Sequence, residues 1–207
     1  MTITIIHLVI DDARHYKCQD LTDPSPLDMR VSPKTAIAFS KPRSLTSGNR
    51  LAREQGLSVM DFGNDRLDGL QQIRAMISSN NKAPMIEKLG LALVEIERGH
   101  AVFEGVPDRS VYNPLGGVHG GYAATLLDSA CGIAVHSQLG PRRGHSTLEL
   151  KVSYLRGLTE KSGTVRAVGR VTSMGGRVAF AEATLRDGAG QLCATATSTL
   201  LVFDLKR

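Results

Sequence analysis

The spacing of apolar and polar positions changes near residue 60 of the chain. Residues 1–59 hold four of the eight prolines and follow neither a helical nor an alternating period. Beyond Met60, apolar side chains recur every three or four residues, at Leu67, Leu70, Ile73, Met76 and Ile77. This spacing predicts an amphipathic helix, with Asp65 as its N-terminal cap.

Residues 1–59 have two interpretations. They form either a disordered regulatory or targeting extension, or an upstream translation that the cell never makes because synthesis starts at Met60. Mass spectrometry of the natural protein separates the two, since a tryptic peptide from before Met60 excludes the short form. The early apolar run 3–10 is too short to span a bilayer and has no basic segment before it, so we expect no signal peptide and a cytoplasmic protein. We assign residues 60–207 to one folded domain.

The pattern after Pro84 predicts one long helix and several strands. The segment 122–138 is apolar on nearly every side, which is typical of a buried helix. A short helix at 85–89 precedes it. Alternating or β-branched runs bounded by glycine turns predict strands at 91–97, 100–106, 147–155, 163–173, 177–186 and 191–203.

Short turns without intervening helices predict an antiparallel meander. One buried helix and one such sheet give an α+β fold in which the sheet wraps around the helix. That arrangement leaves an edge strand and an apolar face uncovered, so we expect a homodimer, or a larger homo-oligomer such as a tetramer.

Composition and charge narrow the class of protein. Apolar residues make up 42% and charged residues 22%, which is typical of a globular domain. A net charge of +5 suits an anionic partner, but tryptophan is absent and no Lys/Arg run accompanies aromatic residues, so we expect no nucleic-acid partner. The phosphates of coenzyme A fit this charge equally well. Cys18, Cys131 and Cys193 form no CxxC pair, which argues against a disulfide framework and a zinc site, and we expect no cofactor.

The strongest candidate for chemistry is Asp128, which lies in the middle of the apolar helix 122–138. A carboxylate among apolar neighbours is costly unless it has a partner or a task. Glycines at 116, 117, 120 and 121 let the backbone approach a ligand and bring free N–H groups to the helix start, where the dipole favours negative charge. His119 either contacts a substrate or caps the helix.

Helix length constrains how these groups act together. Gly120 and Asp128 are eight residues apart, which corresponds to about 12 Å along a helix. One substrate carbonyl cannot meet both from a single chain. If both act on one substrate, Asp128 must come from the second subunit of a dimer, and Gly120 and Asn113 from the first.

The segments that carry this chemistry resemble the hotdog-fold acyl-CoA thioesterases of the PaaI type, related to phenylacetate degradation, within the 4-hydroxybenzoyl-CoA thioesterase-like group. The resemblance covers about residues 65–203. Its most specific part is Asn113, then His119-Gly120-Gly121, then Leu126-Leu127-Asp128, with fifteen residues from Asn to Asp and nine from His to Asp. The run 147–156 also resembles the strand that follows the helix in this family.

The resemblance implies a thioester hydrolase that cleaves an aryl-, phenylacetyl- or medium-chain acyl-CoA. It implies that Asp128 is the general base or the nucleophile, and that the Gly120 amide is the oxyanion donor. Asn113 would orient the thioester or the attacking water. The hydroxyl that holds water falls at Thr147, or at Ser146 when the count starts from Asp128.

The remaining implied contacts concern substrate binding. The resemblance places His119 beside the thioester sulfur or the pantetheine arm, with Gly121 and Tyr122 also against the substrate. Two departures from the family stand out: Gly157 replaces a common proline and alters a turn, and Tyr122 follows the two glycines and is expected to narrow the acyl pocket. Arginines 142, 143, 156 and 177 are the candidates to meet the coenzyme A phosphates.

Two other functions compete with hydrolysis. A dehydratase or hydratase of the same fold needs a histidine where this chain has Pro114, so that function lacks its base. A non-catalytic acyl-CoA-binding regulator needs an output module, and the segment before Met60 shows no helix-turn-helix pattern. A pure binder also gains nothing from a buried acid, so Asp128 favours catalysis.

Overall fold

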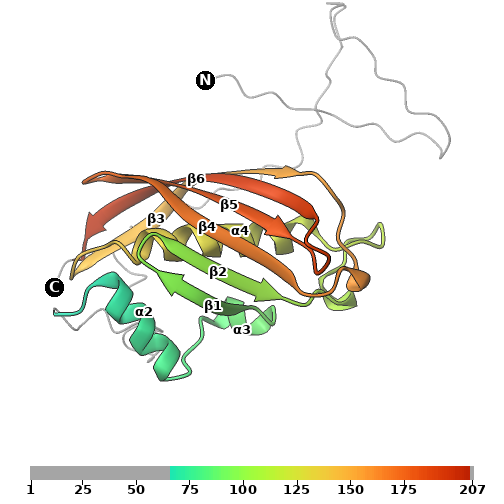
Figure 1. The fold of residues 1–207 in the computed structure, drawn as a ribbon, viewed down its shortest axis with the longest axis horizontal. Helices are drawn as coiled ribbons and strands as arrows, with labels where there is room; N and C mark the ends of the chain where they lie inside the picture. The colour runs from blue at the N-terminus through green and yellow to red at the C-terminus, as the bar shows by residue number, and fades with distance from the viewer. Residues whose placement is uncertain (1–65, 206–207) are drawn as a thin grey trace, which may run out of the picture. The chain divides into compact units, whose positions relative to one another are not determined.

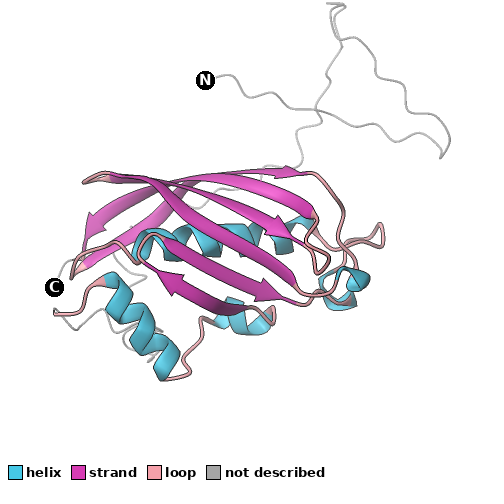
Figure 2. Cartoon of the chain, viewed as in Figure 1, coloured by secondary structure: helices cyan, strands magenta, loops and turns pink. Residues whose placement is uncertain are grey.

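The computed structural model describes residues 66–205, which form an antiparallel sheet and a long helix preceded by two shorter ones (Figure 1, Figure 2). The predicted extension 1–59 and the predicted cap Asp65 lie outside the described residues, as does Cys18. The α-helices are α2 (Gly69–Ser78), α3 (Pro84–Lys88) and α4 (Gly120–His136). The strands are β1 (Ala92–Glu97), β2 (His100–Gly105), β3 (Arg143–Tyr154), β4 (Val165–Met174), β5 (Val178–Arg186) and β6 (Leu192–Asp204), with 3-10 turns η1 (Arg109–Val111) and η2 (Glu160–Ser162).

The six strands lie in the order β1-β2-β4-β5-β6-β3, and every neighbouring pair is antiparallel. β4, β5 and β6 form the predicted meander. The prediction is wrong for β3, which pairs with β6 at the edge of the sheet rather than with β4. A meander needs a tight turn between successive strands, whereas residues 155–164 form a longer connection with its own 3-10 turn, η2. This connection allows the chain to cross from the edge strand to the middle of the sheet.

Helix α4 packs against the inner face of the sheet, so the predicted α+β arrangement is confirmed (Figure 2). Leu126, Leu127 and Ala130 are completely buried. A Cβ at Gly169 of β4 would lie only 2.3 Å from the carbonyl oxygen of Ala130, so glycine is needed for this backbone approach. Small side chains on the strands opposite allow the same closeness elsewhere, at Ala167, Ala179, Ala181, Ala183, Ala194 and Ala196.

Helix α2 begins with a capping box made by Asp68, not by the predicted Asp65. The N–H of Gln71 donates to the Asp68 carboxylate at 2.9 Å, and the Asp68 N–H donates to the Gln71 side chain at 2.9 Å. Gly69 packs on the end of α4, where a Cβ would lie 1.8 Å from the His136 carbonyl oxygen. These contacts hold α2 beside the C-terminal half of α4, where it becomes one wall of the candidate site.

The predicted boundaries differ from the observed ones by a few residues. The long helix starts at Gly120 rather than at 122, because His119 caps it. Strand β3 starts at Arg143, four residues before the predicted strand 147–155. Within residues 66–205, no helix is long and apolar enough to cross a membrane.

Candidate active site

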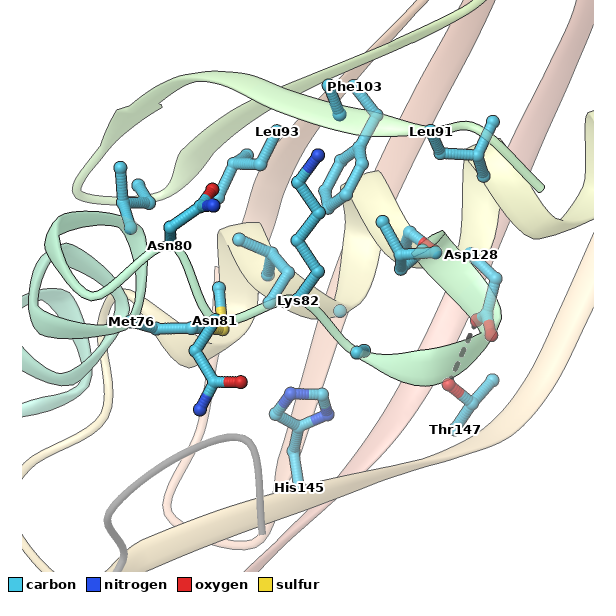
Figure 3. A pocket seen from close by; sticks show the side chains of 17 residues that line it. Met76, Asn80, Asn81, Lys82, Leu91, Leu93, Phe103, Asp128, His145 and Thr147 are labelled. Atoms are coloured by element: carbon cyan, nitrogen blue, oxygen red, sulfur yellow. Dashed lines mark hydrogen bonds between the residues drawn. The ribbon is translucent and has the colours of Figure 1, made fainter. Parts of the chain in front are cut away.

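Asp128 projects from α4 into a cavity and is hydrogen-bonded to a side chain of β3 (Figure 3). The Thr147 hydroxyl donates to Asp128 Oδ1 at 3.0 Å. The cavity has a volume of about 440 Å³ and both residues line it. The carboxylate therefore has a fixed orientation and a face open to a ligand, which is the geometry that general base or nucleophilic catalysis requires.

The rest of this cavity is mainly apolar. Its walls come from both short helices, three strands and α4, and include Met76, Ile77, Ile86, Leu93, Phe103 and Ile133. The loop between α2 and α3 contributes polar side chains to the cavity wall, at Asn80, Asn81 and Lys82 (Figure 3). An apolar space with a carboxylate in its wall suits a ligand that has a hydrocarbon part and a polar group to be attacked.

The sequence left Thr147 and Ser146 as alternatives for the hydroxyl that holds water. Successive side chains of a strand point to opposite faces, so only one of the two can meet Asp128. Thr147 makes this contact. Ser146 is exposed and does not line the cavity.

A second cavity, of about 330 Å³, lies at the N-terminal end of α4. It is lined by His119 and Gly120 of the predicted motif, together with Tyr154 and Arg156. It shares no lining residue with the cavity of Asp128. Within one chain, the predicted base and the predicted oxyanion donor therefore belong to different cavities. This agrees with their separation of about 12 Å along the helix.

His119 caps α4. Its Nδ1 accepts a hydrogen bond from the Gly121 N–H at 2.8 Å, so of the two interpretations of His119 the structure shows the cap. This bond also occupies the Gly121 amide. The Gly120 N–H has no acceptor among residues 66–205. Gly120 thus presents a free amide at a helix N-terminus, where the dipole favours an anion.

Tyr154 of β3 holds the same helix start from the other side. Its hydroxyl donates to the Gly120 carbonyl oxygen at 3.0 Å. A Cβ at position 120 would lie 3.2 Å from the tyrosine ring, so the ring packs directly over the glycine. Tyr154 and His119 together fix the direction in which the Gly120 amide points.

Asn113 shapes the loop before α4. Its side-chain oxygen accepts from the N–H groups of Leu115 at 2.9 Å and Gly117 at 3.3 Å. The observed contacts of this oxygen are thus within the loop. A role of Asn113 in orienting the thioester or water stays a prediction, and it rests on the amide nitrogen of the side chain.

The Tyr122 side chain lies in the core between α4 and the sheet. It is 4% exposed and lines neither of the two cavities. The ring packs against Gly105, where a Cβ would lie 2.3 Å from the hydroxyl, and burial raises the pKa of Tyr122 to about 12. In the single chain the side chain points between helix and sheet, and a contact of Tyr122 with the substrate stays a prediction.

Comparison with known proteins shows the family of the chain. Residues 115–194, which include both ends of α4 and Thr147, match the family model of the Thioesterase superfamily. The chain belongs to the thioesterase superfamily. The predicted class of activity, thioester hydrolysis, is confirmed with it.

The similarity of this thioesterase to its relatives covers most of the length of each relative. A 1,4-dihydroxy-2-naphthoyl-CoA hydrolase from Listeria monocytogenes is 25% identical over 116 residues, which are 56% of this chain and 93% of the relative. A conserved protein from Pseudomonas aeruginosa is 32% identical, with a TM-score of 0.55 over 59% of this chain and 95% of its own. The PaaI protein of the Escherichia coli phenylacetic acid degradation operon is 19% identical, with a TM-score of 0.56 over 64% and 94%. The predicted hotdog fold is confirmed.

The contact between Thr147 and Asp128 predicts a measurable effect on this thioesterase. Thr147→Val keeps the shape of the side chain and removes the hydroxyl that orients the carboxylate. We expect kcat to fall about tenfold with little change in KM, because one hydrogen bond at the reacting group is lost. Steady-state thiol release tests this, with Thr147→Ser as the variant that keeps the hydroxyl. Equal kcat for the valine variant and the parent would contradict it.

His145 is a lining residue that the sequence reasoning missed. It lies two residues before Thr147 on β3, and its ring faces the same cavity as Asp128 (Figure 3). Alternation along the strand would have pointed to it, but the predicted strand began at 147 and excluded it. Burial lowers the pKa of His145, so the ring is neutral near pH 7.

Proposed function

We propose that this thioesterase hydrolyses an aryl-, phenylacetyl- or medium-chain acyl-CoA to the free acid and coenzyme A. The observation that carries the proposal is the Asp128–Thr147 pair in the wall of an apolar cavity. The cavity volume, about 440 Å³, is near the lower end of the range of small-molecule sites, roughly 300–1,000 Å³. A compact acyl group therefore suits it better than a long fatty chain.

The relatives support the same substrate class. The Listeria protein is named for the hydrolysis of an aromatic acyl-CoA, and the PaaI protein comes from the phenylacetic acid degradation operon. We extend these substrates to this chain as a proposal. The apolar walls from α2, α3 and the first two strands supply the surface that such an acyl group would contact.

In the proposed mechanism, Asp128 accepts a proton from water, and the resulting hydroxide forms a bond to the thioester carbonyl carbon. The N–H of Gly120 donates to the carbonyl oxygen as its negative charge develops. The carbon–sulfur bond then breaks, and the departing thiolate takes up the proton. Direct attack by Asp128 on the carbonyl carbon, followed by hydrolysis of the anhydride, uses the same groups and gives the same products.

This mechanism requires a dimer in which Gly120 of one subunit meets Asp128 of the partner subunit. The proposal rests on the two separate cavities of the single chain. It is supported by the sheet edge at β3, which pairs only with β6 among the described strands. Leu148 and Tyr154 are exposed on this edge strand, at 60% and 56%, which an interface would cover.

The contacts of the single chain indicate where the twofold axis would pass. A twofold axis that places Gly120 of one subunit beside Asp128 of the partner subunit would pass alongside α4 near residue 124, midway between them. Tyr154 contacts Gly120 and Thr147 contacts Asp128, so the same axis would pass alongside β3 midway between 147 and 154. We therefore propose that the two β3 strands pair antiparallel, centred near Leu150 and Lys151.

Of the four arginines that are candidates to meet the coenzyme A phosphates, Arg156 lines the cavity of Gly120. Its guanidinium lies 3.5 Å from the Gln191 side chain and is exposed. Because the thioester must reach Gly120, the coenzyme A part of the substrate would approach from this side. We propose that Arg156 meets a coenzyme A phosphate and that His119 lies beside the pantetheine arm.

Thiol release from a panel of acyl-CoAs tests the proposed function. We expect the full chain to release coenzyme A from phenylacetyl-, benzoyl- and hexanoyl-CoA, and from palmitoyl-CoA at least about tenfold more slowly in kcat/KM, because the cavity is too small for sixteen carbons. The release is followed with a thiol reagent. Tight binding of acyl-CoA without release from any member of the panel would overturn the hydrolase and favour an acyl-CoA-binding regulator.

A further inference from the structure

The cavity of Asp128 contains a polar ring that the proposed mechanism does not use. His145 lines the cavity from β3, and its Nδ1 is buried without a hydrogen-bond partner in the described part of the chain. Its Nε2 is not among the buried nitrogens that lack a partner, and no hydrogen bond to it is formed among residues 66–205. The ring therefore presents Nε2 to the cavity (Figure 3).

Two independent measures place His145 relative to the reacting groups. It lies two residues from Thr147 along β3, which corresponds to about 7 Å. The ring also touches Gly132, where a Cβ would lie 3.2 Å from His145 Cε1. Gly132 is four residues beyond Asp128 on α4, which corresponds to about 6 Å. Both measures place the ring about 6–7 Å from the Asp128–Thr147 pair along the wall of the cavity.

The neighbouring histidine does not share this exposure to the cavity. His136 lies edge-to-face with His145, with ring centroids 5.5 Å apart. Its Nε2 lies 3.0 Å from the Gln72 side-chain oxygen, and the Gln72 amide nitrogen donates to the Leu67 carbonyl at 2.9 Å. His136 is thus 2% exposed and bonded toward α2, while His145 faces the ligand space.

The hydrogen positions on His145 follow from this burial. A neutral imidazole carries one N–H and one lone pair. Buried N–H groups without an acceptor are rarer in proteins than buried acceptors without a donor. The lone pair therefore belongs on the buried Nδ1, and the N–H belongs on Nε2, where it points into the cavity.

We propose that His145 is a specificity-determining residue that donates from Nε2 to an oxygen of the acyl group, which lies beyond the thioester carbonyl carbon by about the 6–7 Å that separates the residues beside the ring from the Asp128–Thr147 pair. This inference rests on the proposed function and narrows its substrate class to acyl groups with a hydroxyl or carbonyl oxygen at that position. The polar atoms of a buried side chain are normally hydrogen-bonded. Among residues 66–205, His145 Nδ1 is buried without a partner, and the ring lines the cavity of Asp128.

Three acyl-CoAs of similar length test the proposal on the full chain: hexanoyl-CoA, 6-hydroxyhexanoyl-CoA and 5-oxohexanoyl-CoA. The last carries an acceptor and no donor. We expect kcat/KM to be about tenfold higher for both oxygenated substrates than for hexanoyl-CoA, because an apolar acyl group leaves the Nε2–H without an acceptor. His145→Leu should bring both ratios close to one. His145→Gln, which keeps an N–H donor, should restore part of the preference.

His100→Leu is the matched control, because His100 lies on β2 and does not line the cavity. It should keep the ratios of the parent. Equal kcat/KM for all three substrates in the parent, or unchanged ratios in His145→Leu, would overturn the inference while leaving the hydrolase intact. Failure of the proposed function is distinguishable, because then no substrate releases thiol.

A second measurement needs no substitution. In the full chain labelled with ¹⁵N-histidine, binding of 6-hydroxyhexanoate should move the Nε2 resonance of His145, whereas hexanoate should leave its hydrogen bonding unchanged. The parent spectrum is assigned by its difference from His145→Gln. Identical shifts with both acids would contradict the proposed hydrogen bond even if the leucine variant failed to fold.

Discussion

Asp128→Asn is expected to lower kcat at least about a hundredfold for every acyl-CoA that the parent hydrolyses, because general base and nucleophilic catalysis both require the carboxylate. Asparagine has nearly the same shape and keeps an oxygen that can accept from the Thr147 hydroxyl. The local structure should therefore persist, and the loss should appear in kcat rather than in KM. Initial rates of thiol release measure it.

Glu97→Gln is the matched control for this substitution. Glu97 is exposed at the end of β1 and lines neither cavity, so the same change from acid to amide should leave the rate within about twofold of the parent. Thermal unfolding of both variants separates loss of catalysis from loss of the fold. If Asp128→Asn kept more than about a tenth of the parental kcat, Asp128 would not be the essential carboxylate.

Gly120→Pro is expected to lower kcat about 10²- to 10³-fold, the effect of losing one oxyanion donor. Proline removes the amide hydrogen and nothing else that the structure uses, since this N–H has no acceptor among residues 66–205. The first position of a helix tolerates proline. His119 before it has φ −61° and ψ 135°, which is the backbone region that a residue preceding proline adopts.

Gly120→Ala separates the amide from the space around it. Alanine keeps the N–H and adds the same Cβ, 3.2 Å from the Tyr154 ring, that proline adds. We expect the alanine variant to lose less than about tenfold, because the ring must shift only slightly. Equal losses for the two variants would assign the effect to crowding of Tyr154 and would contradict the oxyanion role of the amide.

The same two positions show whether the site is shared between subunits. A hybrid dimer of an Asp128→Asn subunit and a Gly120→Pro subunit, isolated with two different affinity tags, should recover about half of the parental rate if each site takes Gly120 from one subunit and Asp128 from the other. One of its two sites then contains both native residues. If each site were built within one chain, the hybrid would be as inactive as its components.

Local patterns in the sequence determined the elements and the motif. The period of two marks β4, β5 and β6, and an apolar run without a polar face marks α4, because side-chain direction repeats with the backbone geometry of each element. Asp128 was recognisable because a carboxylate in such a helix is costly. The separation of Gly120 from Asp128 also followed from helix rise alone, and the two distinct cavities agree with it.

Tertiary contacts decided what local patterns leave open. β3 lies beside β6 because strand order depends on pairing between distant segments, and no local period records it. The choice of Thr147 over Ser146 depended on the phase of β3 relative to α4, since alternation shows that one of them faces the helix but not which. Tyr122 follows the motif directly, yet helix rotation turns its ring into the core.

The sequence by itself therefore determined the fold class, the family and the residues of the motif, all of which depend on short spacings and residue type. Only the tertiary structure decided that His119 caps α4, that the Gly120 amide has no acceptor among residues 66–205, and that His145 joins Asp128 in one cavity. The physical reason is that these properties depend on which partners a side chain meets. Such partners come from segments far apart in the chain, and packing selects among them.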